Sequence, residues 1–292
     1  NVDVLQGRAK FTGPNTLVVE GAGEPITVTA GAIVIATGSS PIQIPGFTFD
    51  HQTVLDSTSA LALQAVPKRL LVIGGGYIGL ELGGVYARLG RQVTVVEAMT
   101  QLLPGFEADI VRLVERKLKA HGAQILLEHK AKGWEKTANG AVCTVLDPKG
   151  IEKRLDCDAI LVTVGRRPSS GGLGLDVPGV AVDARGFITV DSKRRTNVPG
   201  VYAIGDVVGN PMLAHKASNE GEVVAEVIAG HDVVFEPRGI PAVVFTDPEI
   251  SAVGLSESEA KAKGLAVKVG KYPFAGLGRA LTTGETDGFV RV

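Results

Sequence analysis

Cysteine is scarce in this chain of 292 residues, and the two cysteines have no functional spacing. Cys143 and Cys157 stand fourteen positions apart, which excludes a disulfide framework and matches no redox or zinc motif. The five histidines show no metal spacing either, so we expect no metal site. So few cysteines are typical of the reducing cytoplasm, and we interpret both as small apolar residues inside a sheet.

The sequence also lacks an excess of charge and a long apolar run. The 30 lysines and arginines nearly balance the 31 aspartates and glutamates, giving a formal net charge of −1, which argues against a nucleic-acid partner. No stretch of about 18 uncharged apolar residues could span a membrane, and no basic-then-apolar leader indicates a signal peptide. We therefore expect a cytoplasmic protein that uses no membrane.

Glycine, in contrast, is abundant: 38 of the 292 residues are glycine, nearly twice the usual share of about 7%. Since glycine permits tight turns and close approach of the backbone to a ligand, the excess favours a ligand-binding protein. The apolar share of 45% and the charged share of 21% are ordinary for a folded protein. The length suggests two domains of roughly 150 residues each.

The two ends of the sequence indicate a piece of a longer protein. Residue 1 is Asn1 and not methionine, and the run Phe289–Val292 alternates like a strand directly after the turn pair Asp287-Gly288. We therefore interpret the chain as the middle of a longer protein. The alternatives are ends that were not observed, or a processed terminus.

From residue 68 onward, apolar strands alternate with amphipathic helices. We expect a strand at 69–73, a helix ending near 89, a strand at 92–96, a helix at 109–121, a strand at 125–127, an antiparallel meander with turns at 139–140 and 147–150, and a buried strand at 159–164. This βαβαβ run followed by a meander predicts one nucleotide-binding domain of about 100 residues.

The flanking segments are organised differently. We expect strands near 10–12 and 16–20, a buried strand at 32–36, a short helix near 57–63, a strand at 201–204, a helix at 211–228, and a third unit opening at 241 with a strand at 242–245. Ser256 and Glu259 form a capping box for a short helix in that third unit.

The strongest motif is Gly74-x-Gly76-x-x-Gly79, which follows a predicted strand and opens a helix. Gly74 permits the sharp turn, Gly76 lets the backbone approach a pyrophosphate at the helix N-terminus, and Gly79 allows close packing of helix on strand. Glu97 ends the next strand, where it can accept hydrogen bonds from the adenosine ribose and repel a 2′-phosphate. No lysine or arginine follows in residues 98–101, so the motif predicts NAD rather than NADP. The alternative is a glycine-rich turn of the core.

A second group of residues follows other strand ends. Gly205-Asp206 ends an apolar strand, Thr37-Gly38 ends another, and Pro211–His215 opens a helix whose N-terminus can stabilise a bound ring system. The alternative for Asp206 is a helix cap or a loop anchor. We interpret Arg166-Arg167 as solvated loop charges.

These motifs carry a resemblance. The string Leu71–Glu81 resembles the NAD motif of the flavoprotein pyridine nucleotide–disulfide oxidoreductases, and Ala36–Ser39, Gly165–Pro168 and Tyr202–Asp206 resemble further motifs in the family's order. Within that family, two more stretches resemble the dihydrolipoamide dehydrogenases rather than glutathione or mercuric reductases. These stretches are Pro211–Lys216 with Glu220-Gly221, and Phe245–Glu249.

The resemblance implies an α/β fold. A Rossmann-like NAD domain would be inserted in a split, here incomplete, FAD domain and followed by the start of an α+β interface domain. The implied segments are 1–64 for the first part of the FAD domain, 65–167 for the NAD domain, 168–236 for the second part of the FAD domain, and 237–292 for the beginning of the dimerisation domain.

The resemblance also implies cofactor contacts. The residues implied for NAD are Gly74, Gly75, Gly76, Tyr77, Ile78, Gly79, Glu81, Glu97, Ala131 and Gly165. The residues implied for FAD are Ala9, Thr37, Gly38, Asp206, Met212, Leu213, Ala214 and His215. Among these, Asp206 would bond the ribityl chain, Ala214 would present backbone to the flavin ring, Ala9 would lie by the adenine, and Tyr77 sits where some relatives have an aromatic lid.

The implied activity is that of a homodimeric oxidoreductase that passes electrons from dihydrolipoyl groups through a disulfide and FAD to NAD. Its partner would be the dihydrolipoyl-bearing component of a 2-oxo acid dehydrogenase or glycine cleavage complex. The family's FAD fingerprint, its Cys-x4-Cys pair and its C-terminal His–Glu pair are absent from these 292 residues, so we expect no catalytic residue here. The alternatives are a soluble transhydrogenase, an NADH oxidase, or a non-catalytic nucleotide-binding fragment.

Overall fold

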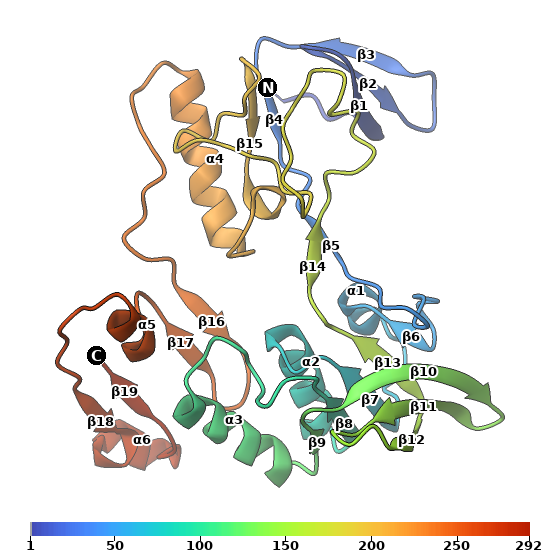
Figure 1. Cartoon of the computed structure of the whole chain (residues 1–292), viewed down its shortest axis with the longest axis vertical. Coiled ribbons are helices and arrows are strands. Elements are labelled where there is room, and N and C mark those ends of the chain that lie inside the picture. The colour runs from blue at the N-terminus through green and yellow to red at the C-terminus, as the bar shows by residue number, and fades with distance from the viewer. Residues whose placement is uncertain (1) are drawn as a thin grey trace. The chain divides into compact units, whose positions relative to one another are not determined.

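The computed structural model describes residues 2–292, which form two compact units (Figure 1). Unit 1 combines residues 2–40 with Arg166–Ile240, and unit 2 combines Pro41–Gly165 with Pro241–Val292. Residues 41–64 and 241–292, which the sequence assigns to other domains, thus pack in the same unit as the nucleotide fold. The division into four domain segments stays a prediction.

Unit 2 is built on a parallel sheet of five strands in the order β6-β13-β7-β8-β9. Its strands are β6 (Val54–Leu55), β13 (Ala159–Val162), β7 (Arg69–Ile73), β8 (Gln92–Val96) and β9 (Gln124–Leu126). β13 is fully buried and β7 nearly so, because helices and a meander cover the sheet. The predicted βαβαβ run is confirmed.

The helices of this run are α2 (Tyr77–Arg88) and α3 (Ala108–Ala120), and α1 (Ser57–Leu61) precedes them. α3 buries Val111, Val114 and Leu118, an apolar stripe at helical spacing. α2 approaches β7 closely because small residues face the strand. A Cβ built on Gly83, for instance, would lie 3.3 Å from Cγ2 of Val72.

The meander consists of β10 (Lys130–Thr137), β11 (Gly140–Leu146) and β12 (Glu152–Cys157), all antiparallel. Cys143 and Cys157 lie buried on β11 and β12, in one apolar cluster with side chains of the parallel sheet. Burial raises the pKa of the Cys143 thiol to about 12 and that of Cys157 to about 11. Both therefore act as apolar core residues, as the sequence predicts.

The C-terminal part of unit 2 consists of short elements. These are β16 (Ala242–Val244), β17 (Ile250–Ala252), α5 (Glu257–Ala262), β18 (Lys271–Pro273), η2 (Phe274–Gly276), α6 (Gly278–Thr283) and β19 (Phe289–Arg291). Val244 and Ile250 join the same core cluster as the parallel sheet. The capping box of Ser256 and Glu259 is confirmed at the start of α5.

Unit 1 contains a three-stranded antiparallel sheet and a parallel strand pair. The elements are β1 (Arg8–Gly13), β2 (Thr16–Glu20), β3 (Ile26–Thr29), β4 (Ile33–Ile35) with β15 (Val201–Ala203), β5 (Ser39–Pro41) with β14 (Arg166–Pro168), η1 (Gly205–Val208) and α4 (Ala214–Ile228). The predicted start of the 211–228 helix is wrong: α4 begins at Ala214, because Leu213 has extended backbone angles and acts as its N-cap.

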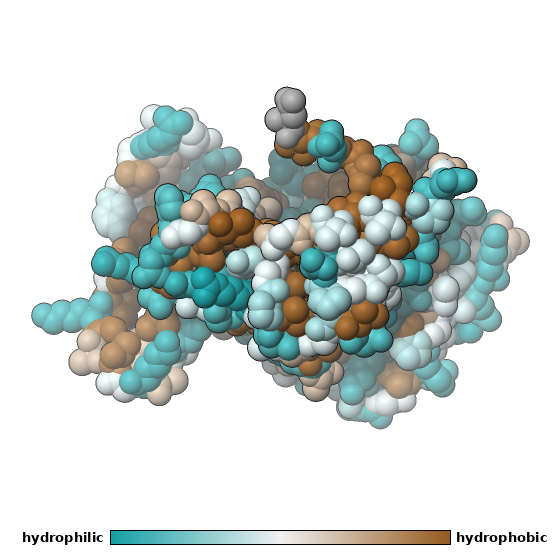
Figure 2. Space-filling model, turned by 90° about the horizontal axis from the view of Figure 1, so that it is seen from above, coloured by the Kyte–Doolittle hydropathy of each residue, from teal (hydrophilic) through white to brown (hydrophobic). Residues whose placement is uncertain are grey.

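The surface seen in Figure 2 alternates between apolar and polar areas. Exposed apolar side chains occur in both units, among them Val2, Val4 and Val34 in unit 1 and Phe245 and Leu281 in unit 2. Within residues 2–292, no helix combines the length and the apolar composition that crossing a bilayer requires.

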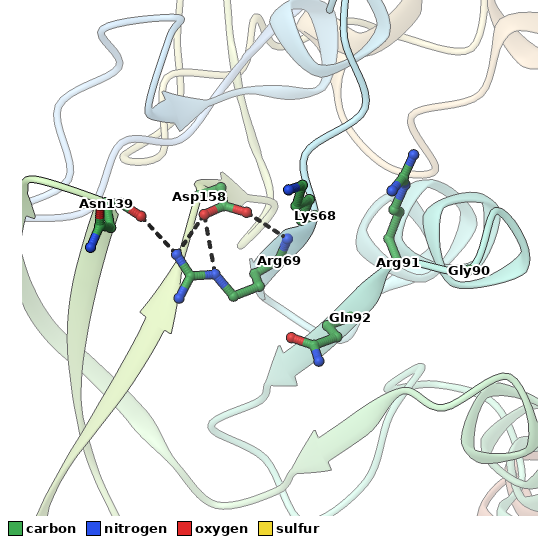
Figure 3. Close-up of a pocket in the computed structure, with 7 residues that line it drawn as sticks. All are labelled: Lys68, Arg69, Gly90, Arg91, Gln92, Asn139 and Asp158. Carbon is green, nitrogen blue, oxygen red and sulfur yellow. Dashed lines mark hydrogen bonds and ion pairs between the residues drawn. The ribbon is translucent and has the colours of Figure 1, made fainter.

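The amino-terminal edge of the parallel sheet has a hollow of about 530 Å³ (Figure 3). Its charged groups pair with one another across strands. Arg69, at the start of β7, bonds Asp158 through Nε at 3.1 Å and Nη2 at 2.6 Å, and its Nη2 also donates to the Asn139 carbonyl at 2.8 Å. Figure 3 shows the Arg91 side chain pointing away from this pair. The hollow is therefore lined by an ion pair that links β7 to the residue before β13 and to the turn of the meander.

Replacing Asp158 by asparagine is expected to destabilise unit 2 by about 1 kcal/mol at pH 7. The effect is modest because the Arg69 and Asp158 side chains are 32% and 28% exposed, which screens the pair. The Arg69 hydrogen bond lowers the pKa of Asp158 below its usual 3.8. The stabilisation is therefore complete above that value and is lost as pH falls through the lowered pKa.

Urea unfolding at pH 7 and at pH 3 measures this effect. Asp156→Asn, on the exposed side of β12, is the matched control and should change little at either pH. An Asp158→Asn penalty that stays the same at both pH values would contradict the ion-pair explanation.

Candidate functional site

The candidate nucleotide site lies at the carboxyl edge of the parallel sheet. β8 and β9 extend from β7 on one side, and β13 and β6 lie on the other, so the strand order reverses between β7 and β13. Gly74 follows β7, Gly165 follows β13, and Glu97 follows β8, so all three come to the same edge. In open parallel sheets this reversal point is where ligands bind.

The three glycines of the fingerprint differ in whether the fold itself requires glycine at that position. Gly74 has φ +107°, and a Cβ there would lie 2.6 Å from the Thr163 carbonyl oxygen. A Cβ on Gly79 would lie 2.3 Å from the Gly74 carbonyl oxygen. A Cβ on Gly76 would meet nothing within 4 Å, and its φ of −77° suits any residue. The fold therefore requires glycine at 74 and 79 but not at 76, which leaves open space beside Gly76.

The space beside Gly76 adjoins the N-terminus of α2. Gly76 is the N-cap and makes no side-chain capping bond, and the first turn contains no acidic residue. Helix N-terminal amides and the helix dipole favour an anion at such a position. Of the predicted residues in this turn, Tyr77 is 40% exposed and Ile78 is half-buried. This arrangement can bind a phosphate group.

Glu97 is 8% exposed, and its carboxylate is held by backbone amides. Oε2 accepts from the Gly75 amide at 2.6 Å, and Oε1 accepts from the Met99 amide at 2.7 Å. A carboxylate has about four lone-pair positions, so both oxygens keep capacity for hydroxyl donors. The same side chain thus connects the fingerprint loop to the end of β8.

His129 and Lys153 are neighbours of this site that the sequence reasoning missed. The His129 amide donates to the Glu97 carbonyl oxygen at 3.0 Å. Its Nδ1 lies 2.6 Å from the Leu127 carbonyl oxygen and so must donate, which leaves Nε2 to accept from Lys153 Nζ at 3.1 Å. Lys153 comes from β12 in the meander, so no local sequence pattern connects it with Glu97.

The other residues predicted for NAD lie on separate elements of unit 2. Oε1 of Glu81, on α2, accepts from the Phe245 amide at 2.9 Å. Gly165 has φ +127°, and its carbonyl oxygen accepts from the Ile42 amide at 3.0 Å. Ala131 lies within β10 and packs against the apolar cluster of the meander.

A second candidate site lies within unit 1. β4 and β15 are parallel, so Thr37-Gly38 and Gly205-Asp206 leave the same edge of the pair. Ser39 Oγ donates to Asp206 Oδ2 at 2.5 Å, which joins the two loops. Gly205 has φ +78°, a conformation that favours glycine, and the chain turns there into η1.

Arg166 corrects one sequence expectation. It is not a solvated loop charge: its side chain is half-buried, and its Nε donates to Ser39 Oγ at 2.7 Å. Its Nη2 donates to the Ser39 carbonyl oxygen at 2.7 Å. Arg167 is exposed, as expected. The signal available in the sequence was the position of the Arg166-Arg167 pair directly after a buried strand.

The start of α4 has no side-chain cap, and Ala214 and His215 are exposed there, while Met212 and Leu213 are half-buried. Ala9 lies on β1, paired with Val19, and is half-buried. The structure thus joins Ser39 to Asp206 and Lys216, in the first turn of α4, to the carbonyl oxygens of Gly205 and Gly209, and it places Ala9 in a different sheet.

Comparison with known proteins identifies the family. The model of the pyridine nucleotide-disulphide oxidoreductases matches residues 1–221, and that of their dimerisation domain matches residues 240–292. The dihydrolipoyl dehydrogenase of Bacillus subtilis is 47% identical over the whole chain, and that of Haloferax volcanii is 44% identical. The chain spans 62% of the length of each of these two curated relatives.

Solved structures agree with the family match. The HOCl-induced flavoprotein disulfide reductase RclA from Escherichia coli superimposes with a TM-score of 0.90 at 29% identity, covering 99% of this chain and 65% of that one. The predicted fold class, a mixed α/β flavoprotein fold followed by the start of a dimerisation domain, is confirmed, and the family's cofactors are FAD and NAD, as predicted. The chain belongs to the pyridine nucleotide-disulphide oxidoreductase family.

Proposed function

We propose that the protein to which these 292 residues belong is a dihydrolipoyl dehydrogenase, working as a homodimer on the dihydrolipoyl-bearing component of a 2-oxo acid dehydrogenase or glycine cleavage complex. The support is 44–47% identity over the whole chain to relatives with that name, together with a dimerisation-domain match at 240–292. The balanced composition and the scarcity of cysteine favour the cytoplasm.

The observation that carries the nucleotide part of the proposal is the space beside Gly76. A glycine that the fold does not need, at an uncapped helix N-terminus and at the reversal point of a parallel sheet, fits a pyrophosphate. Glu97 would then accept from the adenosine ribose, with its orientation already set by the Gly75 and Met99 amides. The residues present therefore fit NAD.

The residues of unit 1 fit part of a flavin site. Asp206 has one carboxylate oxygen bonded to Ser39 and keeps lone pairs for the hydroxyls of a ribityl chain. The uncapped start of α4 offers backbone amides to an electron-rich ring. FAD, when bound, would accept two electrons from a dithiol and pass them on to NAD⁺ as hydride. These residues would bind and orient it.

The test is turnover by the natural protein that carries these residues. We expect dihydrolipoamide to reduce NAD⁺ in the presence of this protein, and we expect that protein to contain a Cys-x4-Cys pair. A protein that acts on a different disulfide and leaves dihydrolipoamide unchanged would overturn the proposed substrate but not the family match. The structurally similar RclA, for example, is named a flavoprotein disulfide reductase. A soluble transhydrogenase or an NADH oxidase would show no dependence on dihydrolipoamide.

We expect NAD to bind at least about tenfold more tightly than NADP, since Glu97 would face a 2′-phosphate with like charge. Glu97→Arg should reduce that preference by removing the carboxylate and adding a cation. Calorimetric titration of each variant with both nucleotides measures the preference for NAD over NADP.

The matched control is Glu128→Arg, which makes the same charge change at an exposed position near the end of β9. This variant should keep the preference for NAD. Tighter NADP binding by the unmodified protein would contradict the role given to Glu97.

A further inference from the structure

α4 contains a buried charged pair that contacts the loop carrying Asp206. Lys216 is 5% exposed and Glu220 is fully buried. Lys216 Nζ donates to the carbonyl oxygens of Gly205 at 3.1 Å and of Gly209 at 3.0 Å. Oε2 of Glu220 accepts from the Gly205 amide at 2.7 Å. All three bonds go to the two ends of one short segment, with Asp206 between them.

The other contacts of this pair are ionic. Oε1 of Glu220 lies 3.4 Å from Lys216 Nζ and 3.3 Å from Nη1 of Arg194, and it makes no hydrogen bond. The guanidinium of Arg194 lies 4.5 Å from the centre of the Phe235 ring. Removing Lys216 and Glu220 from water, with the Arg194 side chain left only 16% exposed, is costly, and well-packed apolar side chains often give equal or greater stability. Stability alone therefore does not explain this cluster.

We propose that Lys216 and Glu220 are positioning residues that hold Gly205–Gly209 in one conformation, so that Asp206 is placed for the FAD ribityl chain before the cofactor binds. The inference rests on the proposed flavin site. It deepens that site, because Asp206 and the start of α4, which come from separate segments, become parts of one rigid arrangement. Ser39 holds the carboxylate of Asp206, and Lys216 holds the backbone on both sides of it.

The physical reason is preorganisation. A loop that is already ordered loses little conformational freedom when a ligand binds, so its contacts contribute fully to affinity. Without Lys216, the carbonyl oxygens of Gly205 and Gly209 lose their donor and the segment can adopt other conformations. Asp206 would then have to be ordered by the cofactor itself.

The experiment measures FAD affinity of the apoprotein, prepared from the natural protein that carries these residues. Lys216→Met, which keeps the chain length and removes the donor, should weaken FAD binding about tenfold. Lys10→Met is the matched control, since Lys10 is exposed and pairs with Glu20 at 2.9 Å, and it should stay within about twofold.

A double-mutant cycle separates positioning from simple destabilisation. If Lys216 acts through Asp206, then adding Lys216→Met to an Asp206→Asn variant should weaken FAD binding further by less than about twofold. An equal loss with and without the Asp206 carboxylate, or no loss in either, overturns the inference. The unfolding midpoint of each apoprotein, which a purely structural role would move equally in both backgrounds, is measured alongside.

Glu220→Gln gives a second cycle if Lys216→Met does not fold. Glutamine keeps an acceptor for the Gly205 amide, so the loss of FAD affinity should be smaller than for Lys216→Met and should again disappear with Asp206→Asn. Glu222→Gln, on the same helix, is its control and should leave FAD affinity unchanged. A natural protein that binds no FAD at all overturns the proposed function and this inference together, whereas FAD binding that is independent of Lys216 and Glu220 overturns this inference alone.

Discussion

Gly76→Val is expected to lower NAD affinity more than about 100-fold while leaving the unfolding midpoint of the protein nearly unchanged. The fold tolerates this side chain because the Cβ of residue 76 would meet nothing within 4 Å and the backbone there is ordinary for any residue. The ligand does not tolerate it, because the added methyl groups would occupy the space proposed for the pyrophosphate. The two effects together would show that the space serves the ligand.

Two comparison variants make this result specific. Gly133→Val is the matched control, since Gly133 lies on β10 in the same unit, also has nothing within 4 Å of its Cβ, and should leave NAD affinity unchanged. Gly79→Ala should instead unfold unit 2, because its Cβ would lie 2.3 Å from the Gly74 carbonyl oxygen and 2.5 Å from Oγ1 of Thr163. Calorimetric titration and thermal unfolding are measured for all three. Unchanged NAD affinity in Gly76→Val would show that the phosphates bind elsewhere.

Residues 1–292 expressed alone are expected to show no turnover of dihydrolipoamide with NAD⁺. The 292 residues contain one glycine fingerprint, which we propose for NAD, so the sequence offers no second fingerprint of that kind for the flavin pyrophosphate. Cys143 and Cys157 cannot replace a redox pair, because both are buried and burial raises their thiol pKa values to about 12 and about 11.

Flavin binding by the same polypeptide should be weak for a similar reason. Asp206 and the start of α4 offer a few hydrogen bonds worth about 1 kcal/mol each. Their sum does not offset the several kcal/mol lost when a ligand is immobilised. NAD should still bind, because β7, α2, β8 and Glu97 are all present. Absorbance in the flavin bands, NAD titration and a turnover assay measure the three expectations. A stoichiometrically yellow protein that turns over would contradict them.

The local sequence pattern determined most of the elements of the nucleotide fold. β7 and β8 have the predicted bounds, because continuous apolar runs between turn residues leave little choice of register. The capping box of Ser256 and Glu259 and the glycines that end helices act within a few residues, so they too can be recognised without the fold. The helix starting at 214 was predicted three residues early, because only the backbone angles of Leu213 show where the first turn begins.

The tertiary structure alone decided which side chains share a site. Ser39 and Asp206 meet across 167 positions, Ser39 and Arg166 across 127, and His129 and Lys153 across 24, so no local pattern predicts these pairs. It also separated the fingerprint glycines into two that the fold requires and one, Gly76, that it does not. The reason is physical: short-range propensities fix the type of each element, whereas contacts between distant residues depend on how the strands are ordered in the sheet.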